Sequence, residues 1–229
     1  MKLEEKVKEL QTKAKEFLSN YYLVVNGVEI YPKEIEVYYL DVEEFNDVYV
    51  HNHPNQKNRP NRFYVHRKGR GGLDYVVSES DEECYSYLLR SVVIDEQLIV
   101  GPVNTYDAIL AKTGLTKEDL EEVEVNTKKT GKNPYIFTSP RVGLDPNKKG
   151  GKEFKNLELR LLLCDEYYKP REDKGHHYKN REKALTDFMI GEMGAKRMTK
   201  EKAIEEAKEY LGYTPKALKE YPDATSKQQ

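Results

Sequence analysis

The chain has 229 residues, which suffices for one large domain or two small ones. Charged residues make up 34 %, but 38 Lys and Arg nearly balance 40 Asp and Glu, so any basic binding surface must be local. No apolar run approaches a membrane span, and the first residues lack the apolar core of a signal peptide. Two cysteines exclude a disulfide framework, and we expect a cytoplasmic protein with no membrane partner.

The first part of the chain mixes helical and strand patterns. Apolar residues at three- and four-residue intervals predict an N-terminal helix that ends near Asn20. Asn26-Gly27 is a hairpin signal, and the absence of apolar residues predicts a polar loop over 51–62. Strands are expected at 21–25, at 34–40, at 63–77 around a Gly-rich bend, at 85–94 and at 97–100.

Helix signals follow in the middle of the chain. Asn104 or Thr105 is expected to cap a helix, and Thr116 with Asp119 forms a capping box for a second, short one. Later strands are expected at 135–137 and 157–164, whereas the tail is charged and helical in its periodicity. We therefore expect an α+β domain over 1–168 and a helical C-terminal extension over 169–229.

Basic residues gather in two stretches. Residues 57–73 hold six Lys and Arg and no acid, and a second basic stretch runs from 128 to 155. Acidic residues gather instead in 29–47 and 79–83. This pattern favours the binding of a polyanion such as DNA, with one reactive carboxylate beneath it. Solvated loops in a highly charged protein would give the same pattern. The expected contacts to the DNA backbone are Arg62, Arg67, Lys68, Arg70 and Arg141.

Three charged residues interrupt apolar strand patterns. Glu36 lies mid-strand, two residues before Tyr38, although Glu is depleted in strands. It either faces a pocket as a proton-transfer group or belongs to the solvent face of an edge strand. Asp74 and Arg90 also need partners if they are buried; they pair with each other, line the same pocket as Glu36, or do both.

Histidines and glycines in the basic stretch suggest metal or phosphate chemistry only weakly. The string HNH at 51–53 invites comparison with metal-dependent nucleases, but no helix with a second ligand follows it. A zinc site from His51, His53 and His66 would lack a convergent fourth ligand. RKGRGG (67–72) lacks the spacing of a P-loop, so we expect neither a metal nor another cofactor.

Seven motifs occur in a recognisable order between about residues 14 and 165. They are AKEFLSN before a strand pair, E-x-Y in IEVYYL, a His on the next loop, FYVH, LLRSV, GPVNTYDAIL and PRVG. In order and rough spacing this set resembles the alkyladenine (3-methyladenine) DNA glycosylase family of the mixed α/β type. The resemblance implies a single domain with a curved, mostly antiparallel, barrel-like sheet and flanking helices. It also implies a monomeric, metal-free, monofunctional DNA glycosylase that starts base excision repair.

The resemblance assigns roles to residues by position. Glu36 is similar to the general base that activates the attacking water, and Arg90 is similar to the arginine that positions it. Tyr38 and His51 resemble the rings that sandwich a flipped, alkylated purine base.

The rest of the implied base pocket lies on the next two strands. Tyr64 belongs to it, and His66 stands where the family has a pocket tyrosine. Asp74 replaces a pocket asparagine, a change that favours a cationic alkylated purine or a base presenting a donor.

One departure affects the expected substrate. The family places a wedge tyrosine at the tip of a hairpin, where this chain has RKGRGG and no aromatic residue. Either Arg67 or Arg70 fills the gap left by the flipped base, or the substrate is not ordinary duplex DNA. Double-stranded DNA is the expected partner and single-stranded DNA the alternative. The competing functions are a non-enzymatic nucleic-acid-binding module on the same fold and a metal-dependent nuclease.

Overall fold

A computed structural model describes most of the chain, namely residues 3–66, 71–129, 135–145, 147–164, 185–186, 188–194, 196 and 198–222. The chain divides into two compact units, Met1–Leu163 and Cys164–Gln229. The boundary predicted between residues 168 and 169 falls among residues outside the described ranges, as do Arg67, Lys68 and Arg70.

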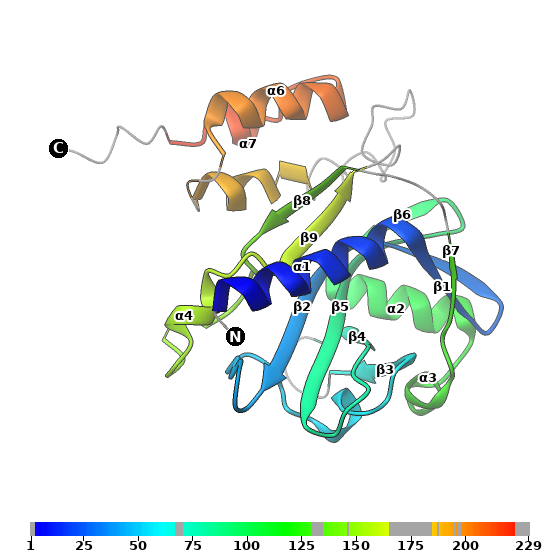
Figure 1. The fold of residues 1–229 in the computed structure, drawn as a ribbon. Helices are drawn as coiled ribbons and strands as arrows, with labels where there is room; N and C mark the ends of the chain where they lie inside the picture. Colours follow the sequence, from blue (N-terminus) through cyan, green and yellow to red (C-terminus); the bar gives the residue numbers. More distant parts are fainter. Residues whose placement is uncertain are drawn as a thin grey trace. The chain divides into compact units, whose positions relative to one another are not determined.

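The first unit is an α+β fold in which an antiparallel sheet curls into a half-barrel with flanking helices (Figure 1). This confirms the predicted fold class. The sheet follows the order β3-β4-β5-β2-β1-β7, with β6 added to β5, β9 to β2 and β8 to β9. The strands are β1 (Tyr21–Val25), β2 (Val28–Asp41), β3 (Arg62–Val65), β4 (Leu73–Val76), β5 (Glu83–Ile94), β6 (Gln97–Val100), β7 (Asn126–Lys129), β8 (Tyr135–Ser139) and β9 (Arg160–Cys164). The helices are α1 (Leu3–Asn20), η1 (Pro54–Gln56), α2 (Pro102–Thr113), α3 (Lys117–Glu122) and α4 (Lys152–Lys155).

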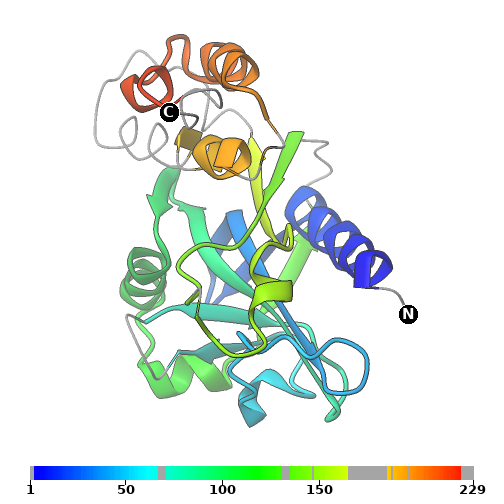
Figure 2. The same ribbon diagram turned by 90° about the vertical axis from the view of Figure 1, so that its left-hand side faces the viewer.

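One face of the sheet forms the apolar core with α1. The helix turns Leu10, Ala14 and Phe17 inward, as its periodicity predicts, and all three are buried. The Phe17 ring lies 5.3 Å from the ring of Tyr75 on β4 and 4.8 Å from that of Tyr87 on β5. Burial of one such side chain stabilises the fold by about 1.5–3 kcal/mol. Figure 2 shows α1 and α2 on different sides of the strands.

The other face of the same strands carries polar groups. Residues directly opposite each other on neighbouring strands point to the same face. Glu36 on β2 lies opposite Leu88 on β5, Leu88 opposite Asp74 on β4, and Asp74 opposite Tyr64 on β3. The register therefore aligns two carboxylates and a phenol in one row across three strand boundaries.

Several predicted boundaries differ from the structure. The cap of α2 is Gly101, not Asn104 or Thr105, because Pro102 starts the helix at the position where a missing N–H costs nothing. The capping box of Thr116 and Asp119 on α3 is confirmed. Strand β7 was missed because it is entirely polar; it is an edge strand that pairs only with β1 among the described strands.

The second unit is helical in its described part. Helical residues occur at 185–186 and 188–194, followed by α6 (Lys200–Leu211) and α7 (Lys216–Lys219). Thr199 caps α6 by accepting from the amide of Lys202, and Gly212 ends it in a left-handed conformation. The buried apolar residues in the described part of the second unit are Leu185, Phe188, Met189, Met193, Ala203, Ala207, Leu211 and Leu218. None of the described helices in either unit is long and apolar enough to span a bilayer.

Candidate active site

Glu36 lies at the centre of a hydrogen-bond network although its side chain is fully buried. Its Oε1 accepts from the amide of Val142 at 2.9 Å and lies 3.2 Å from Nη1 of Arg90. Its Oε2 accepts from the hydroxyl of Tyr38 at 3.0 Å. Glu36 is therefore not part of a solvent face, and that interpretation of the strand pattern is wrong.

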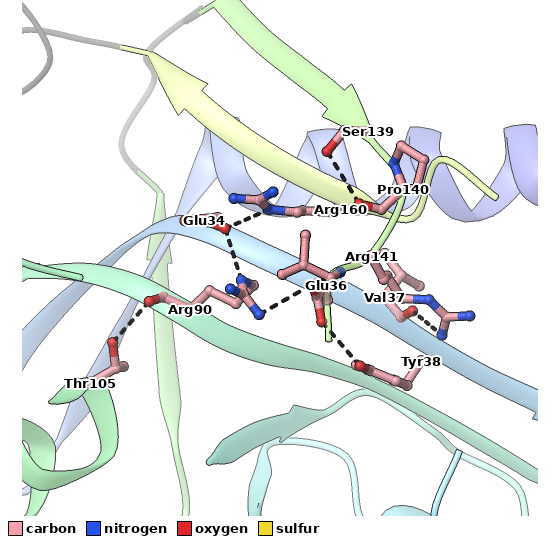
Figure 3. A network of polar contacts seen from close by, with 11 residues as sticks. Glu34, Glu36, Val37, Tyr38, Arg90, Thr105, Ser139, Pro140, Arg141 and Arg160 are labelled. Atoms are coloured by element: carbon pink, nitrogen blue, oxygen red, sulfur yellow. Dashed lines mark hydrogen bonds and ion pairs between the residues drawn. The ribbon is translucent and has the colours of Figure 1, made fainter. Parts of the chain in front are cut away.

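Arg90 joins Glu36 to a second buried carboxylate, Glu34 (Figure 3). Nε of Arg90 donates to Oε1 of Glu34 at 2.8 Å, and Nε of Arg160 donates to the same oxygen at 2.7 Å. Burial raises the pKa of Glu34, but the charges and hydrogen bonds of the two arginines outweigh it and lower the pKa overall. For Arg90 the two glutamates likewise outweigh burial and raise the guanidinium pKa. Arg90 is thus a fixed cation between two carboxylates.

A local irregularity in the sheet aims Arg90 at this position. On β5, Ser91 lies opposite Glu34 and Leu89 opposite Ile35, so Arg90 between them has no cross-strand partner. Such β-bulges often re-aim side chains beside active sites. The carbonyl of the bulged residue is satisfied by the start of α2, because it accepts from the amide of Gly101 at 2.7 Å and from Oγ1 of Thr105 at 3.3 Å.

Arg141 is buried, which corrects the expectation that it contacts the DNA backbone. Its side chain is 0 % exposed and pairs with Asp47 at 2.6 Å. Nη1 also donates to the carbonyl of Val37 at 3.2 Å, and the guanidinium lies 4.7 Å from the ring centre of Tyr38. Arg141 therefore anchors the segment that delivers the Val142 amide to Glu36, and it covers one face of the Tyr38 ring.

The second carboxylate of the row, Asp74, is bound by three donors. Oδ1 lies 2.7 Å from Nε2 of His66, while Oδ2 accepts from Nε2 of Gln56 at 3.1 Å and from Oγ of Ser86 at 2.8 Å. The expected pairing of Asp74 with Arg90 is wrong, because Arg90 is bound to the two glutamates. Asp74 lies in the same row as Glu36, and Arg90 contacts Glu36 directly; that the three line one pocket stays a prediction.

The predicted ring residues of the base pocket gather around His66. Nδ1 of His51 lies 3.0 Å from the hydroxyl of Tyr64, and the rings of His51 and His66 are 4.7 Å apart. The ring of His53 stacks on Tyr64 at 5.1 Å. Tyr38 lies at the other end of the row, beside Glu36, where burial and then Glu36 raise the pKa of its hydroxyl well above the usual value.

The surface site predicted at Arg62 is partly occupied by the protein itself. Its guanidinium donates to the carbonyl of Glu122 at the end of α3, next to an ion pair between Arg59 and Glu122. Arg62 is only partly exposed, so a contact to phosphate would use the remaining donors.

Sequence reasoning missed Glu34, Gln56, Ser86, Val142 and Arg160. A charge inside an apolar strand, the signal that pointed to Arg90 and Asp74, also applies to Arg160 in LELRLLL. Gln56 lies in a wholly polar loop and Val142 contributes only its amide, so neither carries a sequence signal.

Within the described ranges, no group of three His, Cys, Asp or Glu side chains is arranged to hold a metal ion. Neither a scan of protein-family models nor a search of curated proteins finds a match to this sequence.

Proposed function

We propose that this protein is a DNA glycosylase that hydrolyses the N-glycosidic bond of a modified purine rotated out of the DNA. The observation that carries the proposal is a buried carboxylate, Glu36, held by three donors on a polar sheet face that also presents ring side chains. The order of motifs that resembles alkyladenine DNA glycosylases supports the same reaction.

The hydrogen bonds of Glu36 support a role as general base. A carboxylate has about four acceptor sites. The amide of Val142, Arg90 and the hydroxyl of Tyr38 occupy three of them, which leaves one for a water molecule. Such a water would donate to Glu36 and attack C1′ of the sugar, while the carboxylate stabilises the positive charge that develops there.

The other end of the row suits recognition of a base. A base inside a duplex must be rotated out before an enzyme reaches its glycosidic bond, at a cost of a few kcal/mol. Stacking on aromatic rings returns roughly 1–3 kcal/mol per base. His51, Tyr64 and His66 supply rings on the face that carries Glu36.

The decisive experiment compares Glu36→Gln with the wild-type protein on oligonucleotides that carry alkylated and deaminated purines, single- and double-stranded. Gln keeps the size of Glu but cannot accept the proton of water. We expect excision, measured as alkali-sensitive abasic sites, to fall by about 10²–10⁴-fold. Binding to the same oligonucleotides should persist, because the change removes a negative charge near a polyanion.

A matched control is Glu29→Gln on the exposed end of the β1–β2 hairpin, outside the polar row. Glu29→Gln should leave excision at the wild-type rate. Binding to DNA without excision of any base by the wild-type protein would instead support a non-enzymatic nucleic-acid-binding module. Strand cleavage that a chelator abolishes would support a metal-dependent nuclease.

A further inference from the structure

Asp74 is buried and is bound by protein groups on both of its oxygens. The residue is 1 % exposed, and three donors, from His66, Gln56 and Ser86, share its two oxygens. The side chain of His66 is the more exposed member of this pair, at 14 % against 1 % for Asp74. The group that this arrangement presents beyond the carboxylate is the imidazole of His66.

The balance of buried charges on this face makes His66 the cation of the Asp74 pair. Glu34 and Glu36 contact Arg90 and Arg160, and Asp47 contacts Arg141. Among the described residues, the only cationic partner of Asp74 is His66. A buried carboxylate without a paired cation is costly, so this geometry favours the protonated ring.

The charged groups around His66 also favour its protonated form. Burial lowers its pKa, but the charge and hydrogen bond of Asp74, together with the charge of Glu36, outweigh burial and raise the pKa overall. The neighbouring His51, which faces His66 and Tyr64, has a lowered pKa because of burial and the charge of His66. The pKa values of two rings 4.7 Å apart are thus shifted in opposite directions, an arrangement typical of assigned acids and bases.

The two nitrogens of the His66 ring differ in their partners among the described residues. Nε2 is bound to Asp74, whereas Nδ1 has no hydrogen-bond partner in the part of the chain that the structure describes. The backbone of Gly72 lies beside this edge, and a side chain there would place its Cβ 3.1 Å from Nδ1. The glycine thus avoids a group that would press on the nitrogen, and the ring stays 14 % exposed.

The distance between the two ends of the row fits a nucleoside. Glu36 and Asp74 both lie opposite Leu88, from either side of β5. Neighbouring strands are about 4.8 Å apart, so the two Cα atoms are separated by roughly 10 Å. A sugar at Glu36 would direct its base toward His66.

We propose that His66, held by Asp74, is the proton donor to the departing base, and that the substrate is an uncharged purine with a hydrogen-bond acceptor. This inference rests on the proposed glycosylase function. Water forms a bond to C1′ and gives its proton to Glu36, while the electron pair of the C1′–N bond leaves with the base. The base takes the Nδ1 proton of His66, and solvent then returns Glu36 and His66 to their starting states.

The charge of the base decides whether an acid is needed. A cationic alkylated purine leaves readily because it already carries a positive charge, and an imidazolium repels it. An uncharged purine is a poor leaving group, and general acids typically contribute about 10²–10⁴-fold to such steps. A protonated His66 therefore favours the uncharged class, in place of the cationic base suggested by an acid at position 74.

The test compares hypoxanthine, which is uncharged, with 7-methylguanine, which is cationic, in the same duplex under single-turnover conditions. We expect the wild-type rate for hypoxanthine to fall as the pH rises through the raised pKa of His66. His66→Asn should lower hypoxanthine excision by about 10²–10⁴-fold and 7-methylguanine excision much less, which changes the ratio of the two rates. Glu36→Gln should instead lower both rates alike.

Two further variants separate the acid from a structural role. Asp74→Asn keeps the imidazole of His66 but removes its negatively charged partner. The pH at which the rate of hypoxanthine excision falls should therefore move to lower values, in step with the His66 titration measured by NMR. Glu29→Gln, which is exposed and outside the polar row, is the control and should leave the ratio as in the wild type.

The outcomes distinguish the two proposals. If His66→Asn lowers both rates equally, or the wild-type protein removes only 7-methylguanine, His66 is not the acid and the glycosylase function stands. If the wild-type protein removes neither base nor any other in single- or double-stranded DNA, the glycosylase function fails and this inference fails with it.

Discussion

Two carboxylates on one face of the sheet are almost equally buried but are held by different cations. Glu36 is bound by Arg90, whose charge does not titrate in the physiological range, and Asp74 is bound by His66, whose charge does. The cation beside Glu36 therefore keeps its charge across neutral pH, whereas the charge of the His66 ring beside Asp74 depends on proton uptake. A general base profits from the first property and a proton donor from the second.

Replacement of Arg90, the cation that does not titrate, should have the largest effect on stability. Arg90→Met leaves Glu34 and Glu36 short of a partner, and breaking a buried ion pair from one side costs about 3–5 kcal/mol. We expect the free energy of unfolding, measured in urea, to fall by that amount. Arg90→Lys keeps the charge but not the fork that reaches both carboxylates, so it should lose less stability and still lose excision. An Arg90→Met protein as stable as the wild type would contradict the network.

A smaller effect is expected from the acidic partner of both arginines. Glu34→Gln weakens two charge-assisted hydrogen bonds, which should cost about 1.5–3 kcal/mol near neutral pH. Because the folded-state pKa of Glu34 is lowered, its contribution is present above the ordinary value of 4.5 and is lost as the pH falls through the folded value. Acid unfolding curves of the two proteins should therefore converge at low pH. Parallel curves would show that Glu34 gains nothing from its charge.

The stability contribution of the His66–Asp74 pair should show the opposite pH dependence and the smallest effect. The folded-state pKa of His66 is raised, so its stabilising contribution is complete below the ordinary value of 6.5 and is lost as the pH rises through the folded value. Asp74→Asn should cost about 1 kcal/mol more in mildly acidic solution than in mildly alkaline solution. Urea unfolding on both sides of neutrality measures the difference. A cost that is the same at both pH values would mean that His66 is neutral in the folded protein.

Local patterns in the sequence were sufficient for most of the framework. The apolar periodicity of α1, the strand at 21–25 and the capping box of α3 depend on neighbouring residues, and all three are present. The fold class was also predicted, because alternation, turn signals and helical spacing are local properties that restrict the architecture. The polar edge strand β7 was not, because only its pairing with β1 makes it a strand.

Charged residues inside apolar strands were the informative signal for the site. Glu36, Asp74 and Arg90 stand out in the sequence because their types conflict with their surroundings, and all three lie on the same face. Which of them pair could not be read in advance. A sheet brings together residues distant in sequence, so the bulge at Arg90 and the register of β4 against β5 decide the partners.

The amino-acid sequence alone thus determined the elements, their order and the residues whose charge needs an explanation. Only the tertiary structure decided that Arg141 is buried against Asp47, and that the charge of Asp74 is met by His66. The physical reason is that local preferences act between neighbours along the chain. Burial and ion pairing depend instead on which distant segments the sheet register brings within hydrogen-bond distance.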